Sequence, residues 1–210
     1  MQLVSHLTRL SVSETLPVLL VRHGRTRHNA ERRFVGRLDV PLDETGQEQA
    51  KRWAEAYADL AVQGIFSSPL LRAKQTASAL GEPTPVQGLQ ELDQGIFEGR
   101  LAAEVMAEQP EFFAQWRRDP SSLRIPEGET LAECQTRCFS ALTQLAQDTG
   151  PGRPIVVVAH QLVLASILLK ILQLPLSMVT RLHQTNTAVN LLSYDGRWLV
   201  HRINDRSHLA

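Results

Sequence analysis

The chain has no net charge, few aromatic residues, little cysteine and no long hydrophobic run. Its 22 basic residues balance 22 acidic ones, so no overall field draws the protein to nucleic acid or to a membrane surface. The most apolar stretch, residues 162–174, is interrupted by Ser166, Lys170 and Gln173 and does not reach membrane-spanning length. We therefore expect neither a nucleic-acid partner nor a membrane partner.

The two cysteines, Cys134 and Cys138, lie four residues apart in a predicted helix and face the same side of it. Adjacent turns rarely form a disulfide, and two thiolates alone do not complete a zinc site. We expect free thiols in a reducing compartment. Residues 1–15 have no signal-peptide apolar core, which favours a short, mobile leader on a cytoplasmic protein.

The chain contains no internal repeat, low-complexity segment or linker, and with 43% hydrophobic residues it is predicted to form a single domain over residues 1–210. Apolar runs and helical periodicities alternate along it. This alternation predicts a three-layer α/β/α sandwich with a mainly parallel central sheet. The predicted strands are 18–21, 64–67, 86–92 and 155–159, with a hairpin over 188–194 and 198–203, and the predicted helices are 45–61, 70–80, 101–120 with a break at Pro110, 130–149 and 162–172.

Two helix starts carry local signals. Thr45 and Glu48 have the spacing of a capping box. Ser68 followed by Pro69 predicts an N-cap with proline at the first helical position. These signals place the starts of the first two long helices.

The stretch LLVRHGRT, residues 19–26, is an apolar run that stops at arginine, histidine and glycine. It predicts a buried parallel strand whose carboxyl end opens onto a loop, and ligands of open α/β sheets bind at that edge. Histidine forms covalent intermediates and arginine grips phosphate with a forked geometry. Arg22 and His23 therefore indicate a phosphate handled by a nucleophilic imidazole, the alternative being two unrelated surface side chains.

Residues 22–37 contain six arginines opposed only by Glu31. A local cluster on a neutral protein suits a small anionic ligand better than a long polyanion, and no stacking aromatics are interleaved with it. A solvated basic loop is the alternative.

Two further strand ends carry similar groups. Arg72 lies at the start of the helix after the strand 64–67, and His160 directly follows the strand 155–159. If these strands are neighbours of the first, both residues converge with Arg22 and His23 on one pocket. Taken singly, Arg72 is equally explained as a helix-surface cation and His160 as a capping histidine.

Short motifs typical of one known protein family follow one another along nearly the whole chain. They are RHGRTRHN at 22–29, FxGxxDxPL at 34–42, SSPLxRAxxTA at 67–77, LxE at 89–91 with GxFEG at 95–99, GET at 128–130, His160, and NDxxHL at 204–209. In this combination the chain resembles the histidine phosphatase superfamily, the phosphoglycerate-mutase-like clan, and its ending resembles the phosphatase branch. The resemblance implies a phosphoglycerate-mutase-like fold with a small helical cap over residues 100–126.

The resemblance also implies roles for individual residues. His23 would be the nucleophile that forms a phosphohistidine, and Glu91 would protonate the leaving alkoxide and then act as base for water. Arg22, Arg72 and a protonated His160 would hold the phosphoryl oxygens without a metal or cofactor, and Asn29 would add a neutral hydrogen bond.

Three positions remain open at this stage. Asp93 and Glu98 rival Glu91 as the acid, and alternation places Asp93 on the strand face of Glu91. Arg25 stands where the family usually has Glu or Gln, and it either adds a phosphate-binding cation near the pocket or faces outward.

The predicted function is that of a metal-independent phosphomonoesterase of the histidine acid phosphatase type, acting on a small phosphorylated metabolite as a monomer or homodimer. Mutases of the clan carry a long insertion after the acid, and only residues 100–127 separate the two glycine motifs here. A mutase-type phosphoryl transferase and a non-catalytic phosphate-ester-binding module are the alternatives. In the cap, a solvated helix face is favoured for Arg117, Arg118 and Arg124, and contact with a substrate carboxylate is the alternative. Core packing is favoured for Met106, Phe112, Phe113 and Trp116, and a border to a nonpolar substrate group is the alternative.

Overall fold

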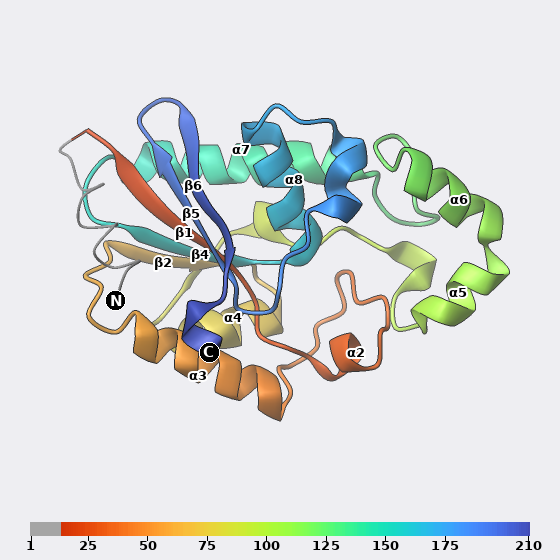
Figure 1. Ribbon diagram of the computed structural model, residues 1–210, viewed down its shortest axis with the longest axis horizontal. Helices are drawn as coiled ribbons and strands as arrows, with labels where there is room; N and C mark the ends of the chain where they lie inside the picture. The colour runs from red at the N-terminus through yellow and green to blue at the C-terminus, as the bar shows by residue number, and fades with distance from the viewer. Residues whose placement is uncertain (1–13) are drawn as a thin grey trace.

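The computed structural model describes residues 14–210, which are built around one six-stranded sheet with the strand order β3-β2-β4-β1-β5-β6 (Figure 1). The predicted leader lies almost wholly outside these residues. β2 pairs in parallel with β3 and β4, and β4 with β1, whereas β5 runs antiparallel to β1 and to β6. The strands are β1 Leu16–Arg22, β2 Gly64–Ser67, β3 Thr84–Pro85, β4 Ile155–Ala159, β5 Val189–Tyr194 and β6 Trp198–Asp205.

Helices cover both faces of the sheet, with α3 and α4 on one face and α7 and α8 on the other (Figure 1). The predicted three-layer α/β/α sandwich is confirmed. α5 and α6 lie beyond the end of the sheet and form the cap, which we define as residues 100–126. The helices are α2 Arg27–Ala30, α3 Glu44–Ala56, α4 Leu71–Ser78, α5 Ala102–Glu108, α6 Pro110–Arg118, α7 Leu131–Thr149 and α8 Gln161–Ile171, with 3₁₀ turns at Gln87–Leu89, Gly95–Phe97, Leu176–Arg181 and Ser207–Leu209.

The central strands are apolar throughout because both of their faces are buried. In β1, Val18 and Leu20 pack against the α7–α8 layer, whereas Leu19 and Val21 pack against the α3–α4 layer. β4 alternates in the same way. A hydrophobic core thus lies on each face of the sheet, and together the two cores fix the carboxyl ends of β1, β2 and β4.

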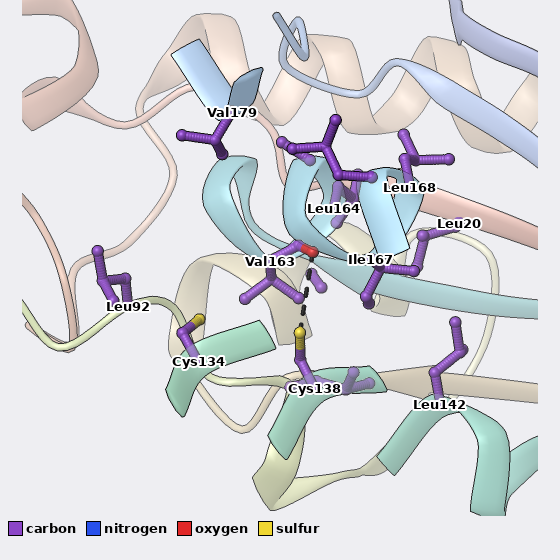
Figure 2. Packing of buried hydrophobic residues seen from close by; sticks show 14 of the residues in the cluster. Leu20, Leu92, Cys134, Cys138, Leu142, Val163, Leu164, Ile167, Leu168 and Val179 are labelled. Atoms are coloured by element: carbon purple, nitrogen blue, oxygen red, sulfur yellow. Dashed lines mark hydrogen bonds between the residues drawn. The ribbon is translucent and has the colours of Figure 1, made fainter. Parts of the chain in front are cut away.

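Cys134 and Cys138 are buried free thiols where α7 packs on α8. Figure 2 shows the Cys138 sulfur directed at the backbone carbonyl of Val163, 3.9 Å away. The expectation of free thiols is thus met, and both side chains fill the core. Among the described residues no helix is long and apolar enough to cross a membrane.

Both predicted helix starts differ from the structure. Asp43, not Thr45, caps α3, because its carboxylate accepts the Gly46 amide at 2.8 Å, while the Thr45 hydroxyl accepts from Arg25. α4 begins at Leu71, and its N-cap position, Leu70, has no side-chain cap. The predicted N-caps lie within two residues of the observed ones. Tertiary contacts of the neighbouring side chains determine which residue caps each helix.

The predicted strand at 86–92 is wrong. β3 covers only Thr84–Pro85, and the chain then turns through the 3₁₀ segment Gln87–Leu89 into irregular backbone. The carbonyls of Gly88 and Gln90 bond to the side chain of Arg137 on α7 rather than to a neighbouring strand. A long-range side-chain contact has replaced the expected sheet ladder.

Candidate active site

Three strand ends meet at one edge of the sheet because β2, β4 and β1 are adjacent. The imidazole rings of His23 and His160 have centroids 5.1 Å apart. Nε of Arg72 lies 3.3 Å from Nε2 of His23. The structure therefore gathers the predicted nucleophile and two of its predicted partners in one buried cluster.

Both ring nitrogens of His23 are held by hydrogen bonds, Nδ1 by a backbone carbonyl and Nε2 by Arg72. Its Nδ1 donates to the carbonyl of Gly24 at 2.7 Å, so Nε2 carries the lone pair and faces Arg72. Burial and the charges of Arg72 and Arg22 lower the pKa of His23 well below its usual range. The ring is thus neutral at physiological pH, the form in which an imidazole is a nucleophile.

The backbone of His23 is anchored by the loop that precedes β5. The side-chain amide of Asn186 donates to the His23 carbonyl at 3.0 Å, and the backbone N–H of Thr187 donates to the Arg22 carbonyl at 3.0 Å. Thr187 has φ +56°, which is rare for a β-branched residue. Sequence reasoning missed this loop. The predicted hairpin could have indicated it. A strand that runs antiparallel to β1 begins at the edge where β1 ends, so the loop before that strand lies beside His23.

Two buried arginines supply positive charge. Arg72 donates Nη1 to the carbonyl of Leu38 at 2.8 Å and Nη2 to that of Gly36 at 2.7 Å, which fixes the guanidinium. Arg22 donates Nη1 to the Gln184 carbonyl at 2.5 Å, whereas its buried Nε has no partner in the described chain. Burial lowers the pKa of each arginine to about 10, so both remain charged at neutral pH.

The surroundings of His160 determine its charge. Nε2 lies 2.7 Å from the Ser68 hydroxyl, and the buried Nδ1 has no partner within residues 14–210. Burial, then the charge of Arg72, lowers the pKa of His160 well below its usual range. Burial and the neighbouring arginines therefore favour a neutral His160 in the free site, and its protonation around a bound phosphate stays a prediction.

Glu91 is the buried carboxyl of this site. Its oxygens accept from the backbone amides of Leu92 at 2.9 Å and Leu162 at 3.3 Å. Burial raises the pKa of Glu91, while these amides and the two arginines act in the opposite direction. The group therefore holds a proton more readily than an exposed glutamate, as a general acid requires.

The rival acids are occupied elsewhere. Asp93 pairs with Arg37 at 3.2 Å, and Glu98 accepts from the amides of Arg37 at 2.7 Å and Gln94 at 3.1 Å. The strand alternation that placed Asp93 beside Glu91 does not exist, since this segment is irregular. Glu91 lines the central cavity, and neither rival does.

The cavity above the cluster has a volume of about 370 Å³ and reaches from the sheet edge to the cap. Asn29 lines it, as predicted, together with Arg22, His23, Arg72 and Glu91. Arg25 does not line it, because its guanidinium pairs with Asp43 at 2.8 Å. The remaining wall is mostly apolar and includes Phe34, Phe97, Met106, Phe112, Phe113, Trp116, Ile125 and Leu162.

The three candidate arginines of the cap have different surroundings. Arg117 lines the cavity. Arg118 lines a separate surface hollow, and Arg124 is ion-paired with Glu133. The cap aromatics pack on one another, with Phe112 and Trp116 stacked at 6.2 Å, and they also form the cavity wall. Core packing was therefore only part of their role.

The histidine phosphatase superfamily (branch 1) model matches residues 18–206. The chain belongs to the histidine phosphatase superfamily. This superfamily member is 33% identical over 205 residues to a probable phosphoglycerate mutase of Salmonella arizonae, covering 92% of this chain and 95% of the relative.

Solved histidine phosphatase folds agree with this assignment. A mycobacterial glucosyl-3-phosphoglycerate phosphatase shares 28% identity with a TM-score of 0.80, over 91% of this chain and 100% of the other. YhfR of Bacillus stearothermophilus shares 26% identity with a TM-score of 0.87, over 93% of this chain and 100% of the other. The phosphoglycerate-mutase-like fold expected from the sequence is thus confirmed.

Proposed function

We propose that this superfamily member is a metal-independent phosphomonoesterase that works through a phosphohistidine on His23. The observation that carries the proposal is the neutral His23 ring, with Nδ1 bonded to a carbonyl and Nε2 facing Arg72 in a buried cavity. Only a basic, unprotonated nitrogen can attack phosphorus, and the Gly24 carbonyl selects which nitrogen that is.

Phosphoryl transfer demands little covalent work from the protein beyond positioning and charge around the equatorial oxygens. Arg22 and Arg72 supply that charge, and Arg22 has a buried Nε available for an oxygen. Asn29 adds a neutral donor. Burial and the charges of the arginines lower the pKa of His160, and the charge of a phosphate dianion would act in the opposite direction, so we expect His160 to gain a proton as substrate binds.

In the first step Nε2 of His23 forms a bond to phosphorus as the ester P–O bond breaks. The proton of Glu91 passes to the departing alkoxide oxygen and yields a neutral alcohol. In the second step Glu91 takes a proton from water, whose oxygen attacks phosphorus while the P–N bond breaks. The products are the alcohol and inorganic phosphate, and both His23 and Glu91 return to their starting states. General acid catalysis of this kind contributes roughly 10²–10⁴-fold.

A mutase is the second candidate, because the Salmonella relative is named a probable phosphoglycerate mutase. A mutase must keep water from the phosphohistidine, which requires a closing lid. The cap here consists of two short helices, α5 and α6, above a cavity of about 370 Å³. We favour hydrolysis, because this small cap leaves the intermediate open to water.

The decisive experiment measures hydrolysis of p-nitrophenyl phosphate in EDTA, with trapping of an acid-labile phosphoryl adduct. His23→Ala is expected to abolish both turnover and adduct. His28→Ala is the matched control, since His28 belongs to the same motif but does not line the cavity. Turnover that persists in His23→Ala, or stops in EDTA, contradicts the proposal. Transfer of the phosphoryl group to a second monoester faster than to water would favour the mutase.

A further inference from the structure

The segment that carries Glu91 has no regular structure of its own. Residues 90–94 belong to neither helix nor strand, and they join two 3₁₀ turns. Buried backbone carbonyls in such a segment need partners from elsewhere. A general acid must also stand within hydrogen-bond reach of the leaving oxygen. Something outside the segment must therefore set its position.

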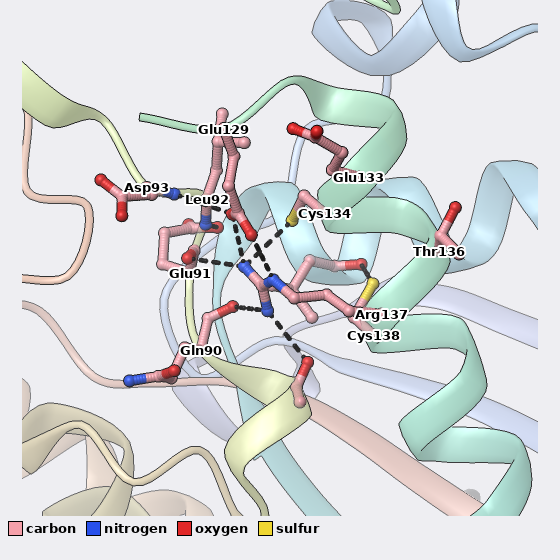
Figure 3. Close-up of polar contacts among 12 residues, drawn as sticks. Gln90, Glu91, Leu92, Asp93, Glu129, Glu133, Cys134, Thr136, Arg137 and Cys138 are labelled. Carbon is pink, nitrogen blue, oxygen red and sulfur yellow. Dashed lines mark hydrogen bonds and ion pairs between the residues drawn. The ribbon is translucent and has the colours of Figure 1, made fainter. Parts of the chain in front are cut away.

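Arg137, in the middle of α7, provides that support. Its Nη1 donates to the carbonyls of Gly88 at 2.9 Å and Gln90 at 2.6 Å, and its Nη2 donates to that of Glu91 at 2.8 Å. Figure 3 shows the guanidinium between this segment and α7, with hydrogen bonds reaching the carbonyls of the segment. One rigid planar fork thus binds three carbonyls around the proposed acid.

Glu129 holds the other side of the same guanidinium. Its carboxylate accepts from Nε of Arg137 at 2.7 Å and from Nη2 at 2.9 Å (Figure 3). It also accepts from the Asp93 amide at 3.1 Å, and its own amide donates to the Asp93 carbonyl at 3.1 Å. A side chain at Gly128 would collide with that carbonyl. The Gly-Glu-Thr motif therefore fastens the acid segment to the start of α7.

The pair acts on the backbone of Glu91 and not on its charge. Glu129 pairs with Arg137 through two hydrogen bonds, and it also pairs with Arg37, which Asp93 contacts in turn. Two carboxylates thus balance two arginines, and no unpaired cation stands behind the acid. The positive charges that act on the Glu91 carboxyl belong to Arg72 and Arg22. Loss of the pair would chiefly displace the carboxyl.

We propose that Arg137, held by Glu129, is a positioning residue that sets the Glu91 carboxyl at the leaving oxygen. The inference rests on the proposed function and deepens it. A displaced acid penalises only those substrates whose leaving group needs a proton. Dinitrophenolate leaves without one, whereas an alkoxide does not.

The test compares Arg137→Met with the wild type on glycerol 2-phosphate and on 2,4-dinitrophenyl phosphate. We compare kcat/KM, which covers formation of the phosphohistidine but not its hydrolysis, where Glu91 acts on both substrates alike. On glycerol 2-phosphate kcat/KM is expected to fall by roughly 10–100-fold, since a small misplacement of a catalytic group costs up to about 10²-fold. On 2,4-dinitrophenyl phosphate kcat/KM is expected to stay within roughly threefold, because that leaving group needs no acid. Glu91→Gln should show the same dependence on leaving group, and the double variant should lose little more.

Arg137→Lys keeps the charge but not the fork, and it carries the test if Arg137→Met does not fold. It should show an intermediate loss with the same selectivity. Arg124→Met is the matched control, because Arg124 likewise pairs with a glutamate and donates to the Gly128 carbonyl but does not touch the acid segment. Equal losses on both substrates would overturn the inference and leave the phosphatase intact. A wild type without His23-dependent activity on 2,4-dinitrophenyl phosphate would instead refute the proposed function.

Discussion

The hydroxyl of Ser68 lies 2.7 Å from Nε2 of His160, and the same oxygen accepts the amide of Leu70 at 3.3 Å. We expect the hydroxyl to donate its proton to this nitrogen, because the structure gives that proton no other acceptor within the described chain. The imidazole then accepts at Nε2 and carries its proton on Nδ1, the buried nitrogen that has no partner among residues 14–210. In the proposed function this N–H would donate to a phosphoryl oxygen.

Ser68→Ala is therefore expected to weaken the binding of inorganic phosphate and orthovanadate by roughly tenfold, since a lost hydrogen bond of this kind costs about 0.5–1.5 kcal/mol. Competitive inhibition constants provide the measurement. Ser67→Ala is the matched control, because the adjacent Ser67 hydroxyl is buried without a hydrogen-bond partner in the described chain. Equal effects of the two substitutions would contradict the tautomer assignment.

The pH dependence of kcat/KM follows from two opposite pKa shifts. His23 must be neutral, and burial lowers its pKa, so activity persists below the usual imidazole range near pH 6.5. Glu91 must be protonated, and burial raises its pKa, so activity is lost as pH rises through that raised value. We expect a bell-shaped profile on an alkyl phosphate. The alkaline limb should be absent from the wild-type kcat/KM profile on 2,4-dinitrophenyl phosphate, whose leaving group needs no acid, and the same limb on both substrates would exclude Glu91 as the acid.

The sheet and its carboxyl edge could be predicted because their signals are local. The apolar run before Arg22 and the one before His160 each reflect burial on both faces, and the sequence shows this directly. The segment around Glu91 could not be predicted in this way. Its shape depends on Arg137, 46 residues further along the chain, and no propensity of residues 86–92 records that contact.

The charge state of His160 in the free site could not be predicted from the sequence either. Motifs identify which residue types converge, but not how deeply they are buried or how strongly two arginines repel a third cation. Likewise, the pairing of Arg25 with Asp43 follows from where the chain returns after α2. Such contacts arise from packing between segments that are distant in the sequence.

The loop before β5 should affect catalysis without touching substrate. Asn186→Ala removes the donor to the His23 carbonyl, and we expect kcat to fall by roughly fivefold, because one hydrogen bond is worth about 1 kcal/mol. Thr185→Ala is the control, since the Thr185 contacts run through its backbone. Thermal unfolding measured alongside should show similar stability for both variants. A fall in kcat that tracks the loss of stability would indicate a structural role only.

Arg117 is expected to select substrates that carry a second anionic group. It lines the cavity from helix α6 of the cap, and it forms no ion pair in the described part of the chain. Arg117→Ala should raise KM for 3-phosphoglycerate several-fold, since a screened ionic contact is worth about 1 kcal/mol, and should leave KM for phenyl phosphate unchanged. Arg118→Ala is the matched control, because the neighbouring arginine faces a different hollow. If Arg117→Ala changes both KM values equally, the cap arginine does not contact the carboxylate, and selectivity must come from the aromatic wall.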